Sequence, residues 1–384
     1  MVGASSIADD LAIGSGVTLF AIVLAGPPAL AWLLEPWIHA LSDRLERRRL
    51  RELGLAGCAL CLALAAWAEN PLFVALAIAG WGLATGVSCG VAQSLLVVGV
   101  EPDRAMTRWA LATAVGDVLA PLLVGATTVI GIAWRGALLV AAGVSILALI
   151  LLRFARPVED VSQATSHLIN SRREVSDFGG AKSGSPKRTS PAPTTPAGLE
   201  KVELRAVLRD RNLLAWLCAM ASCTLLDEII IVIAALRLGS DTVELTVQLT
   251  VLLGSTAFGL SVLSRYLRRY STNRILIASS ALVVVSLLVW WWFPDGPLAW
   301  VALAVLGAAE SVHWPLAKSQ AFQRLPDRPG LVNALESVFN LADVAFPLAI
   351  GAIVTLFGIH AATLVLLIEP LIVAWIAAVV QPTP

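Results

Sequence analysis

The most informative shortage in this sequence is charge. Only 14% of its 384 residues are charged, whereas 58% are hydrophobic. Soluble globular proteins carry about 25% charged and roughly 45–50% apolar residues. A water-soluble fold cannot hide this much apolar surface, so the composition excludes soluble enzymes. Lys and Arg together (27) balance Asp and Glu (27), and without a net positive charge no nucleic-acid partner is expected.

Motifs that carry catalysis or hold cofactors are also missing. The sequence has no phosphate-binding glycine loop, zinc-ligand spacing or nucleophile elbow. Cys58 and Cys61 form a C-x-x-C pair, but no second pair or nearby histidine completes a site. All five cysteines lie in apolar runs, where such side chains serve helix contacts. We therefore expect no cofactor, no metal and no enzymatic activity.

Long apolar segments dominate what is present. A helix that crosses a bilayer needs about 20 predominantly apolar residues. Eleven segments meet this requirement and predict an all-α, multi-pass membrane protein: residues 15–40, 52–68, 71–98, 107–130, 134–153, 212–237, 244–263, 275–293, 297–320, 331–357 and 360–380.

Basic residues indicate which side each connection faces. Lys and Arg lie almost entirely in alternate connections, at residues 44–51, 104–108, 153–211, 265–274 and 318–328. The other connections hold only Arg135 and Arg237. Because cytoplasmic connections are enriched in Lys and Arg, the first set is predicted to be cytoplasmic in a plasma (inner) membrane protein. The C-terminus then lies inside and the first residues outside, and no basic residue is expected deep in the membrane.

Residues 157–210 break the apolar pattern. The stretch SGSPKRTSPAPTTPAG is rich in Ser, Pro, Thr and Gly and cannot bury enough apolar surface to fold. It predicts a largely disordered cytoplasmic linker. The linker separates an N-terminal bundle of five helices (1–156) from a C-terminal bundle of six (211–384).

The two bundles repeat one another. PDR at 102–104 precedes DVLAPLLVGA (117–126), and PDR at 326–328 precedes DVAFPLAIGA (343–352). Each copy carries a predicted helix-packing motif, made of Gly116, Asp117, Pro121 and Gly125 in the first and Asp343, Pro347 and Gly351 in the second. Repeated halves are typical of secondary transporters. The alignment leaves the first bundle one helix short, so we expect a further helix before residue 1. A genuine eleven-helix protein with its N-terminus outside is the alternative.

Two segments carry a family resemblance. HALSDRLERR (39–48) resembles the loop signature of the major facilitator superfamily, and GDVLAPLLVG (116–125) resembles a fifth-helix signature of its proton-driven exporters. The resemblance implies a twelve-helix, two-bundle transporter that works by alternating access. Arginines can bind acidic groups and a carboxylate can cap a helix, so gating contacts are expected at the matching positions. These positions are Asp43, Arg44, Arg47 and Arg48.

Carboxylates inside the predicted spans are the candidate functional groups. A charge at the centre of a spanning helix costs roughly 2.5–3.5 kcal/mol. These groups must therefore face a wet cavity, be hydrogen-bonded or hold protons. The spans contain Glu35, Asp117, Asp227, Glu228, Glu310, Glu336, Asp343 and Glu369.

Two pairs lie near mid-span. Asp227 and Glu228 are adjacent, so at most one is expected to face the centre of a cavity. Glu310 and His313 are three residues apart, which places them on one face of a continuous helix. Such a pair could exchange protons near neutral pH or form a hydrogen-bonded structural pair.

A polar stripe follows from the spacing of Asn333, Glu336, Asn340 and Asp343. It either lines the pathway or packs against a neighbouring helix. Asp343 and its repeat equivalent Asp117 lie near prolines, and structural roles are expected for both. A structural role is also expected for Glu369, which precedes Pro370 and could satisfy a proline-broken turn.

An acidic interior without buried cations disfavours organic anions and favours neutral or cationic amphipathic solutes. The prediction is a secondary transporter of such a small molecule, coupled to protons and working as an exporter in the lipid bilayer. Uptake of a sugar-like nutrient is an alternative for the same fold. A non-transporting receptor and a membrane enzyme using Glu310 and His313 are further alternatives.

Overall fold

The computed structural model describes residues 29–30, 32–40, 46–98, 100–154, 207–238, 242–267 and 269–380. These residues form helices and connecting turns without a strand, and ten of the helical segments are long and apolar enough to cross a membrane. The predicted fold class is therefore confirmed. The ten segments correspond to ten of the eleven predicted spans. The remaining span, 15–40, is described only at 29–30 and 32–40, which are helical.

Four unbroken helices form the described core of the N-terminal bundle. They are α3 (Arg47–Trp67), α4 (Pro71–Leu96), α5 (Pro102–Val129) and α6 (Ala133–Phe154). The start of α4 shows how the sequence sets such boundaries. Pro71 occupies the first helical position, and the Asn70 side chain accepts a hydrogen bond from the Leu72 N–H (2.9 Å). Gly131, with φ of +81°, makes the tight turn between α5 and α6.

The C-terminal bundle contains both unbroken and broken spans. Its elements are α9 (Arg211–Thr224), the π-helical turn η1 (Leu225–Ile229), α10 (Ile230–Leu238), α11 (Thr242–Tyr266), α12 (Thr272–Trp292), α13 (Gly296–Glu310), α14 (His313–Arg324), α15 (Pro329–Phe339), α16 (Leu341–Phe357), α17 (Ile359–Val365) and α18 (Ile368–Val379). Only α11 and α12 run without a break.

Four spans of this bundle are interrupted near their middle. The interruptions are η1, the turn at 311–312, Asn340 and the turn at 366–367. Each lies within three residues of a carboxylate from the predicted set. Broken helices at membrane depth expose backbone groups that must be satisfied by side chains, and in transporters they mark binding sites. The breaks therefore indicate a candidate binding site in the middle of this bundle.

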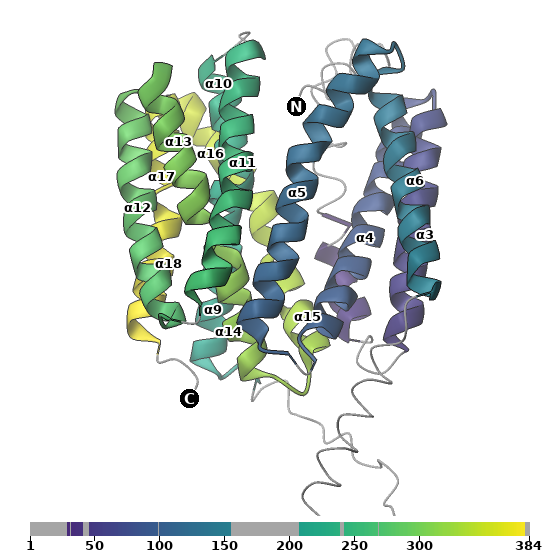
Figure 1. Cartoon of the computed structure of the whole chain (residues 1–384), viewed down its shortest axis with the longest axis horizontal. Helices are drawn as coiled ribbons and strands as arrows, with labels where there is room; N and C mark the ends of the chain where they lie inside the picture. Colours follow the sequence, from purple (N-terminus) through teal and green to yellow (C-terminus); the bar gives the residue numbers. More distant parts are fainter. Residues whose placement is uncertain are drawn as a thin grey trace, which may run out of the picture.

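The two bundles meet along α5, which packs against α11 and α14, and along α4, which packs against α15. Figure 1 shows the bundles converging at the end where α6 finishes and α9 begins, here called the linker end. They separate toward the opposite end, here called the far end. The predicted linker lies outside the described residues except for 207–210, and its disorder stays a prediction.

Candidate functional site

Asp103 connects the bundles at the linker end. It lies in the first turn of α5 and is 9% exposed. Its carboxylate accepts hydrogen bonds from the Thr272 hydroxyl (2.7 Å), the Gln323 amide (3.0 Å) and the Ser319 hydroxyl. Thr272 belongs to α12, whereas Ser319 and Gln323 belong to α14. One carboxylate of the N-terminal bundle thus holds two helices of the other bundle.

Lys318 forms a second connection, deeper in the interface. Its side chain is 2% exposed and donates hydrogen bonds to Gln93 of α4 and to the Glu336 carboxylate of α15. Its ammonium also lies 4.9 Å from the centre of the Trp314 ring. The expectation that the interior holds no cation is wrong. Helix α14 continues to Arg324, so Lys318 belongs to the span rather than to the connection after it.

Helix α15 closes the linker end against the first bundle. Asn333 donates hydrogen bonds to the Gly90 carbonyl (2.6 Å) and the Ser94 hydroxyl (2.9 Å) of α4. Ser337 donates to the Glu35 carboxylate (3.2 Å) in the helical stretch 32–40. Asn333 and Glu35 were both polar candidates in the sequence, and both are buried. In the structure both join helices.

Two glycines of α4 make room for polar side chains of the stretch 32–40. A Cβ at Gly86 would lie 1.5 Å from a Glu35 carboxylate oxygen, and a Cβ at Gly90 would lie 2.3 Å from the His39 ring. Both polar side chains are buried. Any larger residue at either position would therefore displace a side chain of this interface.

A central cavity of about 610 Å³ lies between the bundles. Its polar and aromatic walls come from both halves: Gln93, Trp109 and Asp117 from α4 and α5, and Asp227, Glu228, Glu310 and Trp314 from η1, α13 and α14. Four of these residues are carboxylates. None of the described residues lining the cavity is a lysine or an arginine. The cavity therefore combines carboxyl groups with aromatic faces.

The η1 turn presents both of its carboxylates to this cavity. Asp227 and Glu228 are both exposed and both line the cavity wall, and which of them faces its centre stays a prediction. The cavity space wraps around this turn, because a second cavity of about 230 Å³ also adjoins both residues. Asp227 and Glu310 line the same central cavity.

The smaller cavity collects most of the predicted polar stripe. Its polar lining consists of Thr224, Asp227, Glu228, Glu336, Asn340 and Asp343. Asp343 also accepts a hydrogen bond from the Thr224 hydroxyl (2.7 Å). The stripe therefore divides: Asn333 packs against α4, whereas its other three members border open space.

His313 and Glu369 form a sealed polar cluster behind the cavity. Both side chains are 0% exposed, and the His313 Nδ1 lies 3.0 Å from a Glu369 carboxylate oxygen. The His313 Nε2 lies 3.2 Å and 3.3 Å from the hydroxyls of Ser279 and Ser280. The other Glu369 oxygen accepts the Leu226 N–H of η1 (3.0 Å). Glu369 thus joins the histidine to the turn that carries Asp227 and Glu228.

The predicted pairing of Glu310 with His313 is wrong. Helix α13 ends at Glu310 and α14 begins at His313, and the turn at 311–312 directs the two side chains to different neighbours. Glu310 lines the central cavity, whereas His313 contacts Glu369. The structural role expected for Glu369 is present, but its oxygen satisfies the η1 backbone rather than its own proline-broken turn.

The predicted gating loop is only partly described. Asp43 and Arg44 lie outside the described residues. Arg47 begins α3, and Arg48 forms an ion pair with Glu52 one turn further along the same helix (3.0 Å). For Arg48 the structure therefore shows a local contact within α3.

The described residues make no close helix contact at the glycines of the predicted helix-packing motif. None of them, outside the same helix, lies within 4 Å of a Cβ built at Gly116, Gly125 or Gly351. Asp117, expected to be structural, lines the central cavity instead. Pro347 lies inside α16, and the side chain of Pro121 falls outside the described part.

Sequence reasoning missed Lys318, Gln93 and Asp103 as functional positions. One signal was available for Lys318, because it falls within the predicted span 297–320. Asp103 belongs to a PDR triplet that recurs in the second half. The triplet indicated the internal repeat, but it did not predict that Asp103 contacts the other bundle. Gln93 carried no signal, since its role depends on a partner 225 positions away.

The helical bundles and the cavity between them define an integral, multi-pass membrane transporter. The sequence matches the family model of the Major Facilitator Superfamily over residues 1–335, and the chain belongs to that family. The resemblance indicated by the sequence motifs is thereby confirmed. No curated protein sequence matches the chain.

Solved structures show the same fold at low sequence identity. The human organic anion transporter MFSD10 (TETRAN) is 18% identical with a TM-score of 0.68, covering 98% of this chain and 88% of its own. FucP in the outward conformation is 14% identical with a TM-score of 0.69, covering 99% and 96%. The proton:xylose symporter XylE is 13% identical with a TM-score of 0.68, covering 99% and 88%. Membership of this family and fold establishes secondary transport as the general function.

Proposed function

We propose that this protein exchanges protons for a small cationic, amphipathic solute and works as an exporter. The observation that carries the proposal is the central cavity, where Asp117, Asp227, Glu228 and Glu310 surround a space that also contacts Trp109 and Trp314. Carboxylates attract a cation, and aromatic faces bind its apolar or delocalised part. A neutral amphipathic solute with hydrogen-bond donors would use the same groups.

Coupling follows from competition for the same carboxylates. Asp227 and Glu310 line the same cavity, so a proton and a cationic solute compete for these two carboxyl groups. A bound cation favours the ionised form of both groups, so its arrival expels the proton. Protonation in turn weakens the hold on the cation. Binding of one therefore promotes release of the other, and a proton gradient can drive the solute in the opposite direction.

Alternating access requires two states of the interface between the bundles. Under the positive-inside rule, the linker end faces the cytoplasm of a plasma (inner) membrane protein. The Asp103, Lys318 and Asn333 contacts then close the cytoplasmic side, and the cavity belongs to an outward-facing state. Opening inward must break these contacts, so they bias the equilibrium between the two states.

The test uses full-length protein in proteoliposomes with an imposed pH gradient and a lipophilic cationic dye as the probe. We expect Asp227→Asn and Glu310→Gln each to reduce gradient-driven dye flux at least tenfold. Asp295→Asn is the matched control, because Asp295 is an exposed carboxylate in the far-end turn before α13. Undiminished flux in both cavity variants would contradict the proposal.

A second candidate is proton-coupled uptake of a neutral, sugar-like solute. It is favoured by the His313–Glu369 cluster, which could hold a proton apart from the central cavity, so that proton and solute need not compete. XylE is by its title a proton:xylose symporter. The sign of the flux separates the two candidates. With the outside acidic, symport accumulates a labelled sugar inside, whereas exchange drives the cationic dye out.

A further inference from the structure

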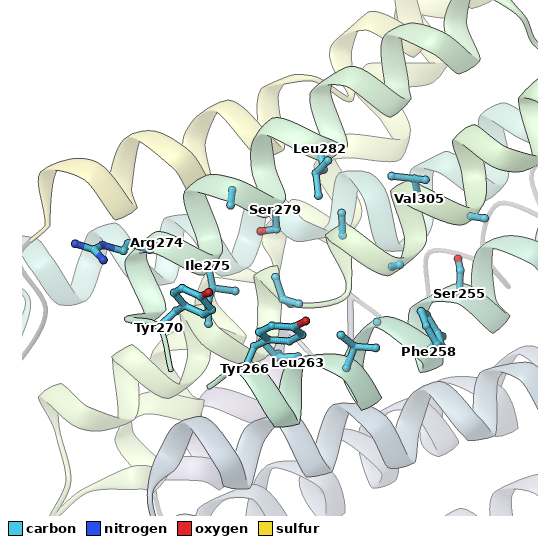
Figure 2. Close-up of a pocket in the computed structure, with 17 residues that line it drawn as sticks. Ser255, Phe258, Leu263, Tyr266, Tyr270, Arg274, Ile275, Ser279, Leu282 and Val305 are labelled. Atoms are coloured by element: carbon cyan, nitrogen blue, oxygen red, sulfur yellow. The ribbon is translucent and has the colours of Figure 1, made fainter. Parts of the chain in front are cut away.

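An apolar groove of about 860 Å³ lies on the outer side of the C-terminal bundle (Figure 2). It is formed by α11, α12 and α13 and shares no lining residue with the central cavity. Helices α11 and α13 contribute to both spaces through different faces. The floor between them is tight, because a Cβ at Gly259 would lie 2.2 Å from the Ala308 carbonyl oxygen. The groove is therefore a separate feature of the surface.

The groove is amphipathic along its length. Phe258, Leu282 and Val305 line it toward one end, and Tyr266, Tyr270 and Arg274 gather at the other (Figure 2). The stretch of α11 that borders it, from Ser255 to Tyr266, spans about 16 Å at the rise of an α-helix. The polar end is the linker end, where α11 finishes and α12 begins.

The polar end carries positive charge and hydroxyl donors. Arg274 is exposed, and the rings of Tyr266 and Tyr270 stack with centroids 6.1 Å apart. None of the described residues that line the groove is acidic. A guanidinium pairs well with a phosphate, and tyrosine hydroxyls lie naturally at the depth of lipid headgroups.

We propose that this groove binds an anionic phospholipid from the leaflet at the linker end. The phosphate contacts Arg274, and one acyl chain passes Tyr270 and Tyr266 and follows the apolar floor. A zwitterionic lipid would bring an ammonium group to a site that has no carboxylate to bind it. The site is therefore expected to prefer an anionic lipid over a zwitterionic one. Anionic lipids are enriched in the cytoplasmic leaflet, where a basic end of this kind attracts them. The proposal does not depend on the transported solute.

An occupied groove would also cover the edge of the buried cluster. Ser279 lines the groove, and its hydroxyl lies 3.2 Å from the His313 Nε2. The His313 and Glu369 side chains are already 0% exposed, so an acyl chain over Ser279 would add a further apolar layer above them.

The test measures retained lipid on purified full-length protein by native mass spectrometry. The protein in neutral detergent is titrated with phosphatidylglycerol or phosphatidylcholine. We expect several-fold higher retention of phosphatidylglycerol, and we expect Arg274→Gln to reduce it about tenfold, the effect of one charge-assisted hydrogen bond. Arg265→Gln is the matched control, because Arg265 is exposed at the same end but does not line the groove.

Two further variants test the apolar part. Ala278→Trp fills the groove from α12 and should lower retention of both lipids, and Val305→Trp repeats the test from α13. Glycerol phosphate, which has the anionic headgroup without an acyl chain, should not displace the lipid. Equal retention of the two lipids, equal behaviour of the Arg274 and Arg265 variants, unchanged retention in both tryptophan variants, or displacement by glycerol phosphate would each overturn the proposal.

Discussion

The two bundles repeat one another in sequence but hold their polar groups differently. In the first, α5 runs unbroken from Pro102 to Val129, and Asp117 in its middle borders the open cavity. In the second, the equivalent Asp343 lies just after the break at Asn340 and is bound by the Thr224 hydroxyl. Among the described residues, Asp117 comes from a continuous helix and has no hydrogen-bond partner, whereas Asp343 is held by Thr224 at a helix break.

The difference begins three residues before each aspartate. That position is Ala114 in the first copy and Asn340 in the second. Alanine is the best helix former, whereas asparagine competes with the backbone for hydrogen bonds and favours helix ends. The second bundle also breaks at η1, where the Glu369 carboxylate accepts a hydrogen bond from the Leu226 N–H. We infer that the first bundle acts as the more rigid wall and the second carries the adjustable polar elements.

The largest effect is expected at the contact between the bundles. Lys318→Met leaves Glu336 without its buried partner, and breaking one side of a buried ion pair costs about 3–5 kcal/mol. The free energy of unfolding in detergent, followed by chemical denaturation, measures this loss. The double variant Lys318→Met/Glu336→Gln should recover most of it.

The control for this prediction is an exposed ion pair of the first bundle. Arg104 and Glu101 lie 2.9 Å apart, and both are exposed. Arg104→Met should change stability by less than about 1 kcal/mol, because surface pairs contribute little. Equal losses at Lys318 and Arg104 would show that the deep contact has no special weight.

The two equivalent aspartates give a direct test of the comparison. Asp343→Ala removes the acceptor for Thr224 and should destabilise the protein by about 1.5–3 kcal/mol, the range for a hydrogen bond to a charged group. Asp117→Ala should cost less than about 0.5 kcal/mol, since its carboxylate borders the cavity, yet it should reduce dye transport several-fold. Thermal unfolding and transport assays on both variants separate the two effects. The reverse pattern would mean that the bundles exchange roles.

Residues that act locally were predictable from the sequence, and residues that act across the interface were not. Apolar length alone located ten spans within a few residues of their helices. The η1 turn was not predictable, because its backbone is bound by Glu369, which lies 143 positions away. The prediction that Glu310 pairs with His313 was wrong because it assumed a continuous helix. The carboxylates of the cavity were found because charge is costly inside a membrane, but their partners depend on how the bundles pack.

The smallest effect is expected at the break itself. Asn340→Ala replaces the residue between α15 and α16 with the one that occupies the equivalent place in α5. Because alanine favours the helix, we expect a gain of about 0.5 kcal/mol in the free energy of unfolding. If the break serves movement of the second bundle, transport should slow although the protein becomes more stable. A variant at Asn340 that is more stable and transports at the original rate would show that the break follows from local sequence preference and has no part in transport.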